Sequence, residues 1–446
     1  MNKRHGLVGC LVLALSVSAF GCDSDDGGDE SISGVIPGEL FVGRSGDVLI
    51  IGNGTSWEEG GVQVSLGAGV TVDSVTVASP TALLVKATAD SAAELGVRDV
   101  TVNDLSFAGA FELNSPVQVK ALQGQTAQGS IAIVKLQNLD FANPFDTTTT
   151  GDGFFTPLEY INIAVTAGTG STAQISSVEP YAMEILLLTD VTAAAGPVDL
   201  EVLSGPADQQ QSFRYPAAFE IEAREATEIT SGSPVTGSID EPYQSVLFSV
   251  SAADLSIVTA STMADSPDAS PAFALLPASG SFAELVTYSN VANFVADDTY
   301  YLVYWDGSGL TGYSYQIGAD LQAAIALDEQ EPNQSTTKAQ KPETLPAVLM
   351  GASLTDTDED WIRVKVPAGG NKTIHAFTYG DDQLTDTWLQ LLGSNGTSVL
   401  GTSSDQGFHE DFYSNPMGPG TYYLKVFPSD YFDPSHDGYS VAITLE

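Results

Sequence analysis

The sequence predicts an all-β protein built of tandem β-sandwiches. Val, Ile, Thr, Tyr and Phe are frequent, and in stretches such as residues 62–66 apolar and polar side chains alternate. Gly and Pro, with 43 and 22 copies, separate these stretches. Many short strands divided by turn residues are typical of sandwich domains. The part of the chain that follows Cys22 contains no cysteine, so its stability must come from apolar cores.

The first residues predict a secretory signal peptide. Two basic residues precede an apolar run over residues 7–20, which is too short to span a bilayer as a permanent helix. Residues 19–22, Ala-Phe-Gly-Cys, resemble the lipobox of bacterial lipoproteins, in which the cysteine is acylated and becomes the first residue of the mature protein. We therefore expect residues 1–21 to be removed and Cys22 to be lipidated. The alternative is an ordinary signal peptide with a chance cysteine.

Charge and cysteine content restrict the partners. Removal of residues 1–21 leaves 425 residues with 13 Lys and Arg against 57 Asp and Glu, a formal charge of −44. Long-range repulsion disfavours nucleic acid and anionic lipid headgroups, whereas divalent cations are attracted. Cys10 lies in the signal peptide and Cys22 is the lipidation candidate, which excludes disulfides and thiol catalysis in the folded part.

Residues 22–33 are acidic and rich in Gly and Ser, with almost nothing to bury. We expect a disordered tether that holds the first domain off the membrane. No second apolar segment is long enough to cross a membrane, so lipid on Cys22 is the only anchor that the sequence predicts. The expected location is the bacterial cell envelope, at the outer membrane or the cell surface rather than the inner membrane.

Residues 34–114 and 115–223 are predicted as two related sandwiches. Expected strands in the first cover residues 62–66, 70–72, 75–77, 83–87 and 100–102. Strands of matching order and spacing in the second cover residues 161–165, 173–178, 184–188 and 196–202, which indicates an internal repeat. Residues 93–102 resemble the closing strands of immunoglobulin-like IPT/TIG domains, and the resemblance implies an Ig-like fold. A polar insertion between Phe141 and Phe155 is a binding loop or a passive surface loop.

A second repeat fills the C-terminal half and predicts domains at 224–322 and 323–446. Its matched segments are 237–240 with 351–354, 246–250 with 361–366, 275–280 with 391–396, 299–303 with 421–425, and 312–315 with 438–441. So many matches in one register indicate duplication of a whole domain. The chain therefore follows a plan of two domains of one kind and two of another.

The last domain resembles the bacterial pre-peptidase C-terminal domain, a jelly-roll-like sandwich related to the collagen-binding domains of collagenases. The resemblance rests on Glu331-Pro332-Asn333, on Asp358-Glu359-Asp360-Trp361 and on residues 420–426. Residues 226–320 resemble a degenerate copy that lacks the first two motifs. The resemblance implies that both C-terminal domains share the jelly-roll-like fold.

The same resemblance implies a Ca²⁺ site in the last domain. Its ligands would be Glu329, Glu331, Asn333, Asp358 and Asp360. Calcium takes roughly six to eight oxygen ligands, and carboxylates brought together from two loops repel one another without a cation. The alternative is an acidic loop that is merely solvated.

Aromatic residues form the second candidate site. In the run 300–305, alternation sends Tyr301 and Trp305 to one face and Tyr300, Leu302 and Tyr304 to the other. One set belongs to the core, and the other is available to stack on sugar rings or on a protein ligand. The candidate ligand-binding residues are Tyr301, Trp305, Tyr423 and Tyr431. The alternative is that these aromatics only pack the sandwiches.

No catalytic constellation emerges from the sequence. The histidines beyond the signal peptide, His375, His409 and His436, are isolated, and no zinc-protease, serine-hydrolase or phosphate-loop motif is present. We expect a non-catalytic, lipid-anchored monomer that serves as a surface binding or adhesion module for an extracellular polysaccharide or matrix protein. The alternatives are an accessory subunit that docks, or presents substrate to, a separately encoded exported peptidase or glycosidase, and a structural spacer of the envelope.

Overall fold

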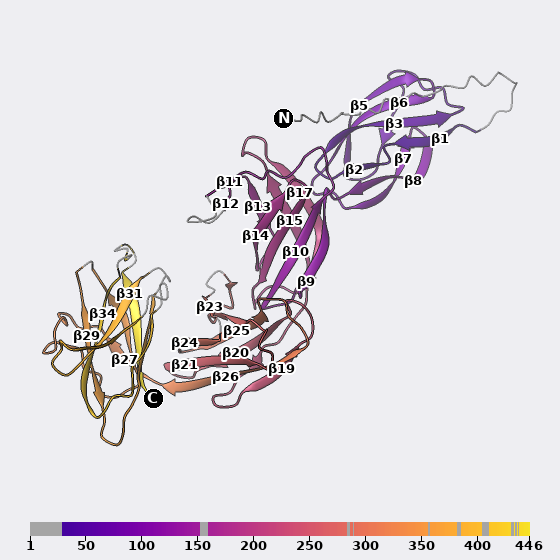
Figure 1. Cartoon of the computed structure of the whole chain (residues 1–446). Coiled ribbons are helices and arrows are strands. Elements are labelled where there is room, and N and C mark those ends of the chain that lie inside the picture. The colour runs from indigo at the N-terminus through magenta and orange to yellow at the C-terminus, as the bar shows by residue number, and fades with distance from the viewer. Residues whose placement is uncertain are drawn as a thin grey trace, which may run out of the picture. The chain divides into compact units, whose positions relative to one another are not determined.

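The computed structural model describes residues 29–151, 159–282, 286–288, 290–355, 357–380, 385–403, 410–429, 432, 435 and 437–446. The chain divides into two compact units, with the boundary between Asn114 and Ser115. The described residues form strands and no α-helix, which confirms the predicted class of all-β tandem sandwiches (Figure 1). In this part of the chain no helix has the length and apolarity needed to cross a membrane. The predicted signal peptide and Cys22 lie outside the described residues.

The first unit is one sandwich. Its strands are β1 (Ser31–Ile36), β2 (Glu39–Phe41), β3 (Ser45–Asn53), β4 (Val64–Ser65), β5 (Val70–Ser79), β6 (Ala82–Ala89), β7 (Gly96–Val102) and β8 (Leu105–Asn114). They form sheets of order β1-β3-β6-β5 and β2-β8-β7-β4. Leu83, Val85 and Ala87 of β6 are buried at every second position, as a sheet with one covered face requires. The two strands expected within residues 70–77 are the single strand β5, whose register shifts at Val72 and Ser74 interrupt its alternation.

The second sandwich begins the second unit. Its strands are β9 (Val117–Gly124), β10 (Ser130–Asn138), β11 (Thr149–Thr150), β12 (Glu159–Tyr160), β13 (Ile163–Thr166), β14 (Ser171–Glu179), β15 (Ala182–Thr189), β16 (Gly196–Ser204) and β17 (Gln211–Ile221). The sheets have the orders β14-β15-β10-β9 and β13-β16-β17, and β11 pairs with β12. This repeats the order of the first sandwich, with β9, β10, β14 and β15 in the places of β1, β3, β5 and β6.

The third sandwich has two sheets around an aromatic core. Its strands are β18 (Thr227–Glu228), β19 (Val235–Ile239), β20 (Ser245–Ser251), β21 (Ser256–Ala264), β22 (Pro271–Leu276), β23 (Val286–Tyr288), β24 (Val291–Ala296), β25 (Thr299–Asp306) and β26 (Tyr313–Ala323). The sheet orders are β18-β20-β25-β22-β23 and β19-β26-β21-β24. Phe248, Phe273 and Tyr304 are fully buried between them.

The fourth sandwich has nearly the same topology. Its strands are β27 (Ile325–Asp328), β28 (Ala347–Ser353), β29 (Asp360–Val366), β30 (Ile374–Gly380), β31 (Thr387–Leu392), β32 (Val399–Thr402), β33 (Asp411–Tyr413), β34 (Gly420–Pro428) and β35 (Gly438–Leu445). The sheet orders are β27-β28-β35-β30-β33 and β29-β34-β31-β32. The inward residues Ile362, Leu389 and Leu424 of the second sheet meet Leu349 and Val441 of the first in one core.

One strand breaks the equivalence of the third and fourth sandwiches. β18 pairs in parallel with β20, whereas β27 pairs in parallel with β28, which belongs to the opposite sheet. The edge of β29 is therefore open to another segment, and Gln340 forms a parallel bridge to Ile362 there. This exchange places the segment 329–341 beside β29, where the predicted calcium ligands lie.

Candidate metal centre and aromatic sheet face

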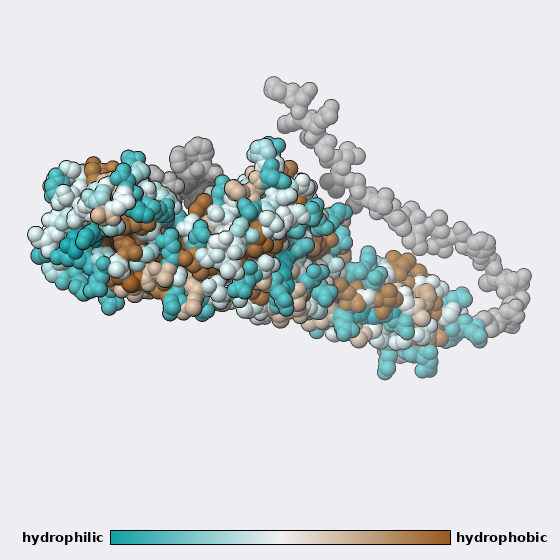
Figure 2. All heavy atoms as spheres, turned by 90° about the horizontal axis from the view of Figure 1, so that it is seen from below, coloured by the Kyte–Doolittle hydropathy of each residue, from teal (hydrophilic) through white to brown (hydrophobic). Residues whose placement is uncertain are grey.

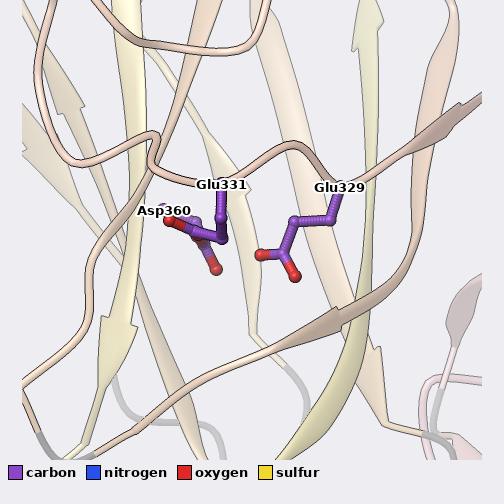
Figure 3. A group of neighbouring side chains, drawn as sticks. All are labelled: Glu329, Glu331 and Asp360. Carbon is purple, nitrogen blue, oxygen red and sulfur yellow. The ribbon is translucent and has the colours of Figure 1, made fainter.

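Three carboxylates converge where the chain enters the fourth sandwich. Glu329 and Glu331 follow β27, and Asp360 is the first residue of β29. One carboxylate oxygen from each residue lies within 4.8 Å of the chosen oxygens of the other two. Figure 3 shows both glutamate side chains extending from the segment after β27 toward the same space as Asp360. The pairing of β27 with β28 directs this segment past the start of β29, so residues about 30 positions apart meet.

Asp360 is completely buried, and its environment favours the protonated acid when no cation is present. Burial raises the pKa of Asp360 from its ordinary value of 3.8 to about 8. The Tyr439 hydroxyl, which donates a hydrogen bond to Asp360 Oδ2, and the nearby Asn333 amide oppose the rise, while the charge of Glu329 adds to it. Burial also raises the pKa of Glu329. A positive charge placed among these groups would reverse both shifts.

The donor set fits a calcium ion. Among the described residues, no hydrogen bond of acceptable geometry reaches Glu329 Oε1, Asp360 Oδ1 or the side-chain oxygen of Asn333, and all three atoms are buried. Buried acceptors without a partner are costly, and few are left in a native protein. Carboxylate and amide oxygens are the ligands that calcium prefers. Asn333 is 1% exposed and donates its backbone N–H to Glu331 Oε2 at 3.1 Å, which holds the two residues together.

Asp358, the fifth predicted ligand, is connected to the three carboxylates through a neighbour. Gln334 Nε2 donates to Asp358 Oδ1 at 3.0 Å and to Glu331 Oε2 at 2.7 Å. Asp358 Oδ1 also accepts the backbone N–H of Glu359 at 2.9 Å. The geometry therefore gives Asp358 the role of fixing the loop before β29, and direct ligation by Asp358 stays a prediction.

The outer face of the sheet β29-β34-β31-β32 carries two aromatic pairs. The ladder sets Trp361 opposite Lys425 and Trp388 opposite Phe427. The rings of Trp361 and Tyr423 have centroids 6.2 Å apart, and those of Trp388 and Phe427 are 5.8 Å apart. Lys425 Nζ lies 4.3 Å from the centre of the Phe427 ring, within the range of a cation–π contact. Because the alternate residues of these strands fill the core, these side chains face outward.

Glu359 connects the acidic loop with this outer face. Its Oε2 accepts the indole N–H of Trp361 at 3.2 Å, and its Oε1 lies 3.1 Å from Lys425 Nζ. Asp360, the next residue, points into the core toward the other carboxylates. A single dipeptide thus joins the candidate metal centre to the aromatic pairs.

The predicted aromatic ligand residues are distributed unevenly. Tyr423 belongs to the outer face, although it is only 9% exposed. Tyr301 and Trp305 are half-buried and pack against an apolar cluster of the second and third sandwiches. The cluster consists of Ile131, Leu188, Leu247, Ala274, Leu276, Phe282 and Val303. Tyr431 lies outside the described residues.

Sequence reasoning missed Trp361, Trp388, Phe427 and Lys425 as members of one surface. Alternation along each strand identifies outward positions, but the register that brings Phe427 beside Trp388 depends on strands 39 positions apart in the sequence. His375 of β30 is buried. Its Nε2 lies 2.8 Å from Asp411 Oδ1, and its ring stacks on Tyr413 at 3.9 Å.

No protein-family model matches the chain, and no curated protein matches it. Among solved structures, the chain is similar to surface glycan-binding protein PbSGBP-B of Prevotella bryantii, with 8% identity over 93% of this chain and 97% of that one and a TM-score of 0.20. It is also similar to SGBP-B of the Bacteroides ovatus mixed-linkage glucan utilization locus, solved with a mixed-linkage heptasaccharide, with 10% identity over 63% and 76% and a TM-score of 0.15. The chain is also similar to tripeptidyl peptidase 2, with 9% identity over 74% of this chain and 33% of that one and a TM-score of 0.17. At such TM-scores the similarities carry no functional argument.

Proposed function

We propose that this chain is an exported, lipid-anchored envelope protein that binds an extracellular polymer without catalysing its breakdown. The binding surface is the outer face of the sheet β29-β34-β31-β32, and the polymer is a polysaccharide. The observation that supports this proposal is the presence of two aromatic pairs on one sheet face, with hydrogen-bonding side chains between them.

The chemistry of the face suits a sugar polymer. Aromatic rings offer flat apolar surfaces on which the C–H faces of pyranose rings can stack, and the polar ends of Gln390, Arg363 and Lys425 supply hydrogen bonds beside them. On the side of the molecule drawn in Figure 2, hydrophobic residues reach the surface in small groups between hydrophilic ones.

We propose in addition that Glu329, Glu331, Asn333 and Asp360 hold a calcium ion. The ion would neutralise the converging carboxylates and hold the segment after β27 against the start of β29. Glu359, the neighbour of Asp360, would then be held in the position from which it contacts Trp361 and Lys425. Calcium would thus stabilise the binding face from one side.

The test is electrophoresis of the full chain through gels that contain soluble polysaccharides, with calcium present. We expect at least one polysaccharide to slow the wild-type chain and Trp388→Ala to remove most of this retardation. Phe141→Ala, which removes a 65% exposed ring of the second sandwich, is the matched control and should migrate like wild type. Retardation that survives Trp388→Ala in a folded protein would place binding elsewhere. If a bound hydrolase is recovered from native extracts and no polymer binds, the accessory role is favoured. If neither a hydrolase nor a polymer binds, the spacer is favoured.

A further inference from the structure

The sheet β29-β34-β31-β32 has a charge opposite to that of the chain. The sequence contains 57 acidic residues and 15 Lys and Arg. Asp360 is the only acidic residue in these four strands, and it is buried on the inner side. Arg363, Lys365 and Lys425 alternate with core residues and therefore belong to the outer face. These strands thus bring three cations and no acid to the outer face of a strongly anionic protein, and Glu359, just before β29, pairs with one of them, Lys425.

A hollow beside β29 adds two further cations, Lys338 and Lys341. It has a volume of about 660 Å³ and is lined by residues 326–328, 330–332 and 338–341. Lys338 and Lys341 are exposed in its wall. This wall is fastened to β29, because Gln340 N donates to Trp361 O at 2.8 Å and Arg363 N donates to Gln340 O at 2.7 Å. Ala339 packs with Trp361 and Tyr423, so the hollow borders the aromatic face.

Four of the five cations of this region are available for a ligand. Of the five, only Lys425 has an ion-pair partner among the described residues, Glu359. Asp328 and Glu331 also line the hollow, and the Glu331 carboxylate belongs to the metal group. When Glu331 is engaged by a cation, Lys338 and Lys341 outnumber the one remaining acid.

We propose that the polymer bound by this face is an acidic glycan, a polysaccharide whose sugar rings carry carboxylate groups. The inference rests on the proposed function of the face. The aromatic pairs stack on the rings, Arg363 and Lys365 pair with carboxylates along the chain, and Lys338 and Lys341 hold one carboxylate in the hollow. Repulsion by the other acids of the protein is screened beyond about 8 Å at physiological salt, so the cations nearest to the ligand decide the interaction.

The experiment is titration calorimetry of the full chain, in calcium, with three soluble oligomers. Galacturonate oligomers provide rings and charges, their methyl esters provide the same rings without charge, and glutamate oligomers provide charges without rings. We expect the galacturonate oligomers to bind most tightly. Lys338→Gln combined with Lys341→Gln should weaken that binding roughly three- to tenfold, the scale for removal of two exposed ion pairs. Lys365→Gln, on another element, should weaken it in the same direction.

The matched control is Lys86→Gln with Lys120→Gln, which removes two exposed lysines far from this face in the sequence. This variant should bind galacturonate oligomers like wild type. Suppose that galacturonate oligomers and their methyl esters bind equally well, that the Lys338→Gln, Lys341→Gln variant binds like wild type, and that Trp388→Ala does not bind. This result would show that the ligand need not be acidic, and it would still support the proposed function. Glutamate oligomers that bind as tightly as galacturonate would overturn the glycan. If neither sugar form binds, this inference is wrong. Electrophoresis in polysaccharide gels then tests the proposed function separately.

Discussion

The hydroxyl of Tyr439 in β35 donates a hydrogen bond to Asp360 Oδ2 in β29, across the interior of the fourth sandwich. The equivalent tyrosine of the third sandwich, Tyr313, donates to Asp306 Oδ2 at 3.0 Å. Asp306 also accepts the backbone N–H groups of Ser270 and Ser308, at 2.9 and 2.8 Å. Burial by itself raises the pKa of Asp306, but these hydrogen bonds outweigh burial and hold its pKa below the ordinary value.

The surrounding protein therefore stabilises opposite charge states of the two buried aspartates. Asp306 is satisfied by protein donors as an anion, whereas one oxygen of Asp360 accepts no hydrogen bond from a described residue. Glu329 and Glu331 lie beside Asp360. This contrast is the physical reason for proposing a cation site in the fourth sandwich and not at Asp306 of the third.

Replacement of Tyr439 by Phe should destabilise the fourth sandwich by about 1–3 kcal/mol, because a buried carboxyl oxygen loses the Tyr439 hydroxyl donor. The measurement is urea unfolding of the full chain in chelator. Tyr422→Phe is the control, since its hydroxyl donates at 2.9 Å to the neutral Gly418 carbonyl from a half-buried position. Equal losses in the two variants would show that the carboxyl contributes nothing special.

Calcium should raise the unfolding midpoint of the fourth sandwich and leave that of the third unchanged. An ion that binds only the native state adds ~2.7 kcal/mol at about 100 times its dissociation constant. Glu331→Gln should remove most of the gain, and Glu343→Gln, an exposed acid in the same connection, should keep it. Thermal unfolding in calcium and in chelator measures both effects. If the unfolding midpoint of the wild-type chain is the same in calcium and in chelator, the site is ruled out.

Stability in chelator should fall as pH rises from about 4 to about 8. The folded-state pKa of Asp360 is raised from 3.8 to about 8, so the folded chain holds a proton that the unfolded chain releases. The stabilisation is complete below pH 3.8 and is lost as pH passes through the folded value. Calcium should reverse the trend, because it binds the ionised carboxylate. Unfolding midpoints of wild type and Asp360→Asn at several pH values test this, and the same slope in both proteins would contradict it.

Asp306→Ala should destabilise the third sandwich by about 2–4 kcal/mol, since the buried Tyr313 hydroxyl and two backbone N–H groups lose their acceptor at once. The exposed Asp297 is the matched control, and Asp297→Ala should stay within about 0.5 kcal/mol of wild type. Chemical unfolding monitored by aromatic fluorescence measures both. A loss below about 1 kcal/mol for Asp306→Ala would mean that water replaces the carboxylate.

Local pattern predicted strands in both N-terminal sandwiches. The expected strand at 184–188 lies inside β15, and the repeat segment 361–366 coincides with β29 except for Asp360. The motif containing Asp358 and Asp360 and the acids after β27 were also predicted as one site, and three of those carboxylates do converge. Tyr301 and Trp305 were predicted to share a face, and they do. The sequence did not predict that an apolar cluster of the second and third sandwiches covers that face.

The sequence by itself determined the all-β class, the repeats and which residues of a predicted strand share a face, because alternation with period two and turn residues act over a few positions. The tertiary structure decided which residues meet. Pairing of β27 with β28 brings Glu331 to Asp360, and the register of β34 with β31 brings Phe427 to Trp388. These contacts follow from how whole sheets bury their apolar faces, so no local pattern contains them.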